Sequence, residues 1–198
     1  LDPGNGGSLG PADSAFGFPP IELRFQWQTS CDHVRNAPYW VYFKAKENEG
    51  LSSDLVVFKT LEIEVKSPAV TITSVEPAGT ALNLIWTRAQ CDHASGYDIY
   101  RYNDSLGYSA PECVTGVPRE LGYELIAEID NVDQLQFADD NQGKGLIHGQ
   151  RYCYIIVTKF GDGSESYPSE EGCGKLIRDV PILNMVSVIS SILPNSPS

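Results

Sequence analysis

The sequence predicts an all-β protein built from antiparallel β-sandwiches in tandem. Apolar and polar residues alternate with a period of two in many short stretches, and turn signals such as 49–50, 77–79, 103–104 and 161–163 separate these stretches. No stretch of a dozen residues has the helical period. Short strands that recur about every ten residues, with no helices between them, are typical of sheets packed face to face.

The alternation predicts the strands in order along the chain. In the first, Ile21, Leu23, Phe25 and Trp27 share one face, and the polar residues between them share the other. The same rhythm predicts further strands at 39–45, 61–65, 70–72, 82–86, 97–99, 123–129 and 152–156. Residues 1–20 are rich in glycine and proline and hold little apolar surface, so they are predicted to form a loop or linker.

A domain boundary is predicted near Ser67–Pro68, because Pro68 cannot donate a hydrogen bond to a sheet. Residues 21–68 hold fewer strands than a complete sandwich, so they are the C-terminal part of a sandwich or borrow strands from elsewhere. Residues 69–178 hold enough strands to close their own core. Residues 179–198 carry one more strand, over 180–189, which is the first strand of a following domain or a tail. Such an unpaired strand needs a partner.

The charge balance excludes two classes of partner. The 198 residues include 14 basic and 26 acidic residues, a net charge of −12, with no cluster of Lys or Arg. This pattern argues against binding to a nucleic-acid backbone or to an anionic membrane surface. No apolar run approaches the roughly 20 residues that a membrane span needs.

Several fragments of residues 69–178 occur in a characteristic order. These are Leu82-x-Leu84-x-Trp86, Gly96 to Arg101, Leu146-x-x-Gly149-x-x-Tyr152 and Gly163 to Ser169. In this order they resemble strands B and C, the approach to strand F and the F–G turn of a fibronectin type III domain. The resemblance implies a core built on Trp86, Tyr97, Leu146 and Tyr152, with the Tyr152 hydroxyl bonded back to the backbone as a tyrosine corner. The chain departs from the family in a long insertion between Arg101 and Leu121.

A narrower resemblance is carried by Cys91, Tyr152-Cys153-Tyr154, Cys173 and Arg178-Asp179-Val180-Pro181. These features are similar to repeats of gliding-motility-associated surface proteins of Bacteroidetes, which the type IX system exports. The upstream unit, with Phe25-x-Trp27 and Cys31-Asp32-His33, resembles the closing strands of an immunoglobulin- or cadherin-like repeat. The resemblance implies an extracellular, cell-surface location.

Five cysteines at wide spacing indicate disulfides or buried thiols, and no Cys-x-x-Cys motif is present. With the strands assigned by resemblance, Cys153 points away from the core and lies opposite Cys173 across the F–G hairpin, so these two are predicted to pair. Cys91 is then predicted to pair with Cys113 and to hold the insertion, which leaves Cys31 with a partner outside the chain. The alternative is a set of reduced thiols.

No catalytic constellation, cofactor or metal site is predicted. Cys31-Asp32-His33 and Cys91-Asp92-His93 repeat one tripeptide, but the two copies lie in different units, which argues against zinc. Residues 139–143 are rich in oxygen ligands but do not fit a calcium loop, so a capped turn is the simpler interpretation. Ser14 and Ser105 match the Asp-Ser-aliphatic pattern that the resemblance associates with O-glycosylation; the alternative is an ordinary exposed loop.

The expected function is therefore a non-catalytic, modular segment of a secreted stalk or adhesin. Its partners would be other domains of a long protein or another surface protein, engaged by strand addition through residues 182–189. The alternative is an accessory spacer or carbohydrate-binding module of a secreted enzyme. For that role Trp40 and Tyr42 are the candidate glycan contacts, although the favoured interpretation places both inside a buried sandwich face.

Overall fold

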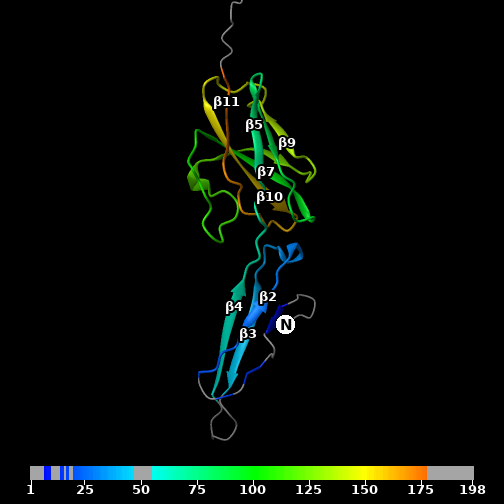
Figure 1. The fold of residues 1–198 in the computed structure, drawn as a ribbon, viewed down its shortest axis with the longest axis vertical. Helices are drawn as coiled ribbons and strands as arrows, with labels where there is room; N and C mark the ends of the chain where they lie inside the picture. Colours follow the sequence, from blue (N-terminus) through cyan, green and yellow to red (C-terminus); the bar gives the residue numbers. More distant parts are fainter. Residues whose placement is uncertain (1–6, 10–13, 16, 18–19, 47–54, 178–198) are drawn as a thin grey trace, which may run out of the picture.

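A computed structural model describes residues 7–9, 14, 15, 17, 20–46 and 55–177. Figure 1 shows two units joined end to end along the long axis of the molecule. Every regular element in the described residues is a strand apart from two short 3-10 turns, and all the named strand pairs are antiparallel. The all-β prediction is confirmed.

The second unit is a sandwich of two sheets. One sheet has the order β5-β6-β9 and the other has the order β11-β10-β7-β8. The strands are β5 (Ile72–Ala78), β6 (Ala81–Trp86), β7 (Ala94–Asn103), β8 (Glu124–Ile129), β9 (Gln136–Asp139), β10 (Arg151–Phe160) and β11 (Gly172–Lys175). A short 3-10 turn, η2 (Arg119–Leu121), lies in the insertion between β7 and β8.

The core of this sandwich forms because alternate residues of each strand point between the sheets. Trp86 and Tyr97 meet edge to face with ring centroids 5.5 Å apart. Leu146 and Tyr152 are also buried in the same cluster. The Tyr152 hydroxyl accepts a hydrogen bond from the backbone N–H of Ile147, five residues earlier, at 3.1 Å. This is the backbone contact that the tyrosine corner predicts.

The first unit consists of two short ribbons. β1 (Gly7–Leu9) pairs with β2 (Phe25–Trp27), and β3 (Tyr39–Lys46) pairs with β4 (Val56–Ile63). The 3-10 turn η1 (Cys31–His33) connects β2 to β3. The Trp27 ring packs on Tyr39 at 4.7 Å, which brings the two ribbons together at the end of β3 near the second unit.

The structure adds elements that the alternation did not predict. Gly7–Leu9 form a strand inside the predicted 1–20 linker, whereas Ile21 and Leu23 are exposed and lie before the strand at 25–27. β9 was not predicted, because it has only four residues. β11 has four residues of which two are glycines, so the alternation does not show it, and its place opposite Cys153 followed from the resemblance alone. The predicted strand at 180–189 lies outside the described residues.

Candidate functional site

The junction between the two units is closed by a disulfide. Cys31 in η1 is bonded to Cys91, which follows β6, across 60 residues of chain. Cys91 is fully buried, and Val34 joins the hydrophobic core of the second unit. The disulfide therefore joins the first unit directly to the core of the sandwich.

Backbone contacts strengthen this junction. Asp162 lies in the turn that follows β10, and its carboxylate accepts a hydrogen bond from the Asn36 N–H at 2.8 Å. The Tyr167 N–H donates to the Ser67 carbonyl at 3.0 Å, and Ser67 forms an isolated bridge with Ser166. Hydrogen bonds from Ser164 and then from the Asn36 N–H lower the pKa of Asp162 to about 2. The carboxylate is thus charged and bonded across the junction at neutral pH.

The predicted pairing of Cys91 with Cys113 is wrong. Cys91 is bonded to Cys31, and Cys113 is a free, exposed cysteine in the insertion. The expectation that the partner of Cys31 lies outside the chain is also wrong, because that partner is Cys91. The repeated Cys-Asp-His tripeptide was the sequence signal that could have indicated the Cys31–Cys91 bond, since its two cysteines meet at the junction.

Cys153 and Cys173 form the second disulfide, as predicted, at directly paired positions of β10 and β11. Cys153 does point away from the core, but it is fully buried rather than facing solvent. Ile155 and Val157 on the same face are also fully buried. The outer face of β10 is therefore covered as well.

The insertion after β7 contributes to this cover. The ring of Tyr123, just after the insertion, lies 5.3 Å from the ring of Tyr102, which pairs with Cys153 on the outer face. Glu171 holds the insertion by accepting hydrogen bonds from the backbone N–H groups of Leu106 and Gly107 and from the hydroxyls of Ser105 and Tyr123. One carboxylate thus anchors both ends of the insertion.

The two candidate glycosylation sites differ in their surroundings. The Ser105 hydroxyl is bonded to Glu171 and accepts from the Gly107 N–H, so it takes part in anchoring the insertion. Ser14 is itself exposed and belongs to no strand or helix. Of the two, Ser14 is the more accessible to a modifying enzyme, and glycosylation at either site stays a prediction.

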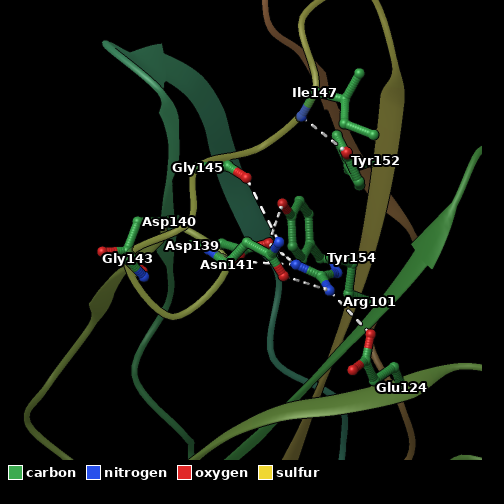
Figure 2. Close-up of polar contacts among 10 residues, drawn as sticks. All are labelled: Arg101, Glu124, Asp139, Asp140, Asn141, Gly143, Gly145, Ile147, Tyr152 and Tyr154. Atoms are coloured by element: carbon green, nitrogen blue, oxygen red, sulfur yellow. Dashed lines mark hydrogen bonds and ion pairs between the residues drawn. The ribbon is translucent and has the colours of Figure 1, made fainter.

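A polar network joins the two sheets at one edge of the sandwich (Figure 2). Nη1 of Arg101 in β7 donates to both carboxylate oxygens of Asp139 in β9, at 3.1 and 3.0 Å, while Nη2 donates to Glu124 in β8 at 2.9 Å. The Tyr154 hydroxyl donates to Asp139 at 2.8 Å, and burial followed by the Asp139 charge raises the pKa of Tyr154.

The same network borders a shallow hollow of about 380 Å³ that reaches Asn141 and Lys144. The carboxylate of Asp139 is bonded by Arg101, Tyr154 and the Asn141 N–H. Asp140 accepts from the Gly143 N–H and caps the turn, as the simpler interpretation of residues 139–143 predicted. The arrangement is suited to holding two sheets together rather than to presenting open oxygen ligands to a cation.

Bonding or burial also limits the chemistry of several other side chains in the described residues. One group has metal-ligand spacing, formed by Cys153, Cys173 and Glu171, and its two sulfurs are joined in the disulfide. Asp98 and Glu165 have raised pKa values, mainly because of burial, and the Asp98 charge adds to the effect on Glu165. Sequence patterns missed these two carboxyl groups, because their burial depends on the cover over β10.

The β3–β4 ribbon exposes apolar side chains in place of a buried layer. Trp40 and Tyr42 on β3 are 51% and 70% exposed, and Val56 and Phe58 on β4 share their face and are 38% and 65% exposed. We call these four residues the bare face. The favoured expectation that Trp40 and Tyr42 lie inside a buried sandwich face is therefore wrong, because both side chains are exposed.

No protein-family model matches the chain, and no curated protein matches it. Among solved structures, an Fn3-like protein from Clostridium thermocellum is 20% identical, with a TM-score of 0.37, and the match covers 59% of this chain and 96% of that one. The FN1–FN3 domains of chicken CNTN1 are 13% identical, with a TM-score of 0.40, over 81% of this chain and 54% of that one. A beta-1,2-glucanase from Parabacteroides distasonis is 14% identical, with a TM-score of 0.41, and the match covers 64% of this chain and 16% of that one.

These likenesses carry no information on function. The class of the second unit follows from its own strand order, in which three strands face four, together with the Tyr152 contact. It is a fibronectin type III-like domain, a modular fold. In the described part of the chain, no helix has the length and apolar content to cross a bilayer. The two disulfides fit an extracellular domain.

Proposed function

We propose that the chain is a non-catalytic segment of a secreted cell-surface protein, in which the two units form a rigid section of a stalk or adhesin. The observation that carries this proposal is the Cys31–Cys91 disulfide across the junction. Units joined by a linker alone move relative to each other by default. A covalent bond into the sandwich core, together with the Asn36–Asp162 hydrogen bond, removes that freedom.

The cell-surface setting is supported by two further features. The chain has two disulfides, and disulfides form and persist in oxidising compartments such as the outside of the cell. The motifs around Cys153 and Cys173 resemble those of surface repeats of Bacteroidetes. Gliding motility and type IX export are therefore the proposed context, and other domains of a long surface protein are the proposed partners.

The rigid junction is tested by ¹⁵N relaxation of the whole chain. We expect both units of the native protein to share one rotational correlation time, because the junction holds them together. In the double variant Cys31→Ser/Cys91→Ser the first unit should tumble faster than the sandwich. The variant Cys153→Ser/Cys173→Ser is the matched control, since its disulfide lies within one unit. Independent tumbling in the native protein would contradict the proposal.

The second candidate function is an accessory, glycan-contacting module of a secreted enzyme. The exposure of Trp40 and Tyr42 favours it, since exposed aromatic rings on a sheet can stack on sugars. Its test is titration with soluble oligosaccharides, comparing native protein with Trp40→Ala/Tyr42→Ala. Saturable binding that the double variant loses would support this function, and no binding to any oligosaccharide class would exclude it.

A further inference from the structure

We propose that the edge of β4 that faces away from β3 in one molecule receives residues 182–189 of a second copy as an added strand. This inference rests on the proposed function as a modular stalk, and it names the partner of that module as the chain itself. Four steps carry it: the open ribbon, the composition of the segment, the reach of the chain and the resulting symmetry.

The acceptor is an incomplete sheet. Among the described residues, β4 pairs only with β3, so its other edge carries unpaired backbone donors and acceptors. Seven of its eight residues are exposed, and Val56, Val57, Phe58 and Leu61 place apolar side chains on both of its faces. Lys59 and Glu62 also lie on this strand, so the apolar side chains beside an added strand are concentrated at its start, over residues 56–58.

The donor has the matching sequence. Residues 182–189 read Ile-Leu-Asn-Met-Val-Ser-Val-Ile, with no charge and with apolar residues at both even and odd positions. The segment has eight residues, the same length as β4. Pro181 precedes it and Pro194 follows it, so prolines bound a region of high β-propensity.

The segment cannot reach the ribbon of its own chain. Lys175 pairs with Arg151 at the start of β10, and Asp162, just past the end of β10, contacts Asn36 of the first unit. The ten residues of β10 separate these points by about 30 Å. The seven residues from Lys175 to Ile182 span at most about 25 Å, and β3 and β4 lie beyond the junction.

The end of the described chain, in orange, accordingly lies at the far end of the sandwich from the β3–β4 ribbon in Figure 1. A segment at one end that fits an acceptor at the other end gives a head-to-tail contact between copies. Such a head-to-tail contact repeats from copy to copy, and we expect it to extend into an open array. An array of this kind lengthens a stalk without any other protein.

Self-association of the chain tests the proposal, in a Cys113→Ser background that removes disulfide-linked dimers. By sedimentation velocity, the 198-residue chain should form species that grow with concentration, and a chain of residues 1–177 should be monomeric. Added salt should promote growth, because each copy carries a net charge of −12 that opposes approach.

Binding of the isolated segment locates the acceptor. A fluorescent peptide of residues 178–194 should bind the 1–177 chain saturably in an anisotropy titration. The variant Val57→Lys/Phe58→Lys should weaken binding about tenfold or more, because it places charge on both faces of the strand that receives the peptide. The matched control is Ile85→Lys, at an apolar residue on the sandwich that is 45% exposed and should leave binding unchanged.

A monomeric full chain together with a peptide that does not bind would overturn the proposal, as would equal binding to Val57→Lys/Phe58→Lys. Self-association that persists in the 1–177 chain would also overturn it, because the contact would then be made by other surfaces. None of these outcomes touches the shared tumbling of the two units, so failure here is distinguishable from failure of the rigid-stalk proposal.

Discussion

Arg101 and Asp139 form an ion pair inside one edge of the sandwich. Their side chains are 10% and 4% exposed, and the Arg101 Nη1 lies 3.0 Å from the Asp139 Oδ2. The two residues belong to opposite sheets, and Glu124, Tyr154 and Asn141 add further hydrogen bonds around them. Their energetic role is to join the sheets where the sandwich would otherwise be open.

The variant Asp139→Asn should be strongly destabilising, because it leaves the enclosed Arg101 charge without its main partner. We expect a loss of about 3–5 kcal/mol in the free energy of unfolding, measured by urea denaturation. The control is Asp133→Asn, which breaks an exposed pair with Arg88 and should cost about 1 kcal/mol or less. Equal effects of the two substitutions would contradict a structural role for the network.

Removing the Cys153–Cys173 disulfide by a double serine substitution should lower the free energy of unfolding by about 3 kcal/mol, since the bond closes a loop of 20 residues. Cys113→Ser should have little effect, because Cys113 is exposed and unbonded. Thermal denaturation of the three proteins checks this. A native protein with three free thiols by mass spectrometry would contradict the assigned bonds.

Gly96→Ala should destabilise the sandwich by about 3 kcal/mol or more. An added Cβ would lie 1.8 Å from the backbone carbonyl oxygen of Ile129, on the neighbouring strand, and backbone cannot move aside cheaply. Gly161→Ala is the control, because nothing lies within 4 Å of its added Cβ. Urea denaturation should separate the two variants clearly, and a native-like Gly96→Ala protein would refute the close approach of β7 and β8.

The insertion should detach at low pH. Burial alone would raise the pKa of Glu171, but hydrogen bonds from Ser105, Tyr123 and two backbone N–H groups together lower it below its ordinary 4.5. The stabilisation is therefore complete above pH 4.5 and is lost as pH falls through the lower pKa of the folded state. Hydrogen exchange at the amides of Leu106 and Gly107, corrected for intrinsic rates, should accelerate below pH 4.5.

The variant Glu171→Gln supplies the control for this prediction. It should show fast exchange at these two amides at every pH, because a neutral amide replaces the anchoring carboxylate. Exchange in the native protein that is independent of pH would contradict the role of Glu171. Exchange in β10 should stay slow in both proteins, since its backbone is paired on both sides.

Strands with strong alternation were predictable because their periodicity reflects the core directly. In β6 the buried Leu82, Leu84 and Trp86 alternate with more exposed residues, as the sequence indicates. In β10 seven consecutive residues are buried, and alternation alone cannot report that its outer face is covered. That cover comes from an insertion whose position depends on Glu171, a contact between residues about 65 positions apart.

The disulfides show the same limit. Cys153 and Cys173 were predictable because a hairpin places them opposite each other. Cys31 and Cys91 belong to different units, and their pairing depends on how the units meet, which spacing does not encode. The bare face was not predictable either, because alternation in β3 indicates a buried layer without showing whether a second layer is present.

The Cys31–Cys91 bond also determines how the molecule carries a mechanical load. A pull applied between residue 30 and the C-terminal end of the sandwich passes through the sulfur–sulfur bond and bypasses the covalent loop of residues 32–90, which contains β3, β4, β5 and β6. Those strands are not stretched as long as the bond is oxidised. Under tension the ribbon therefore keeps its shape, and reduction of one bond would put about sixty residues of extra length into the tether.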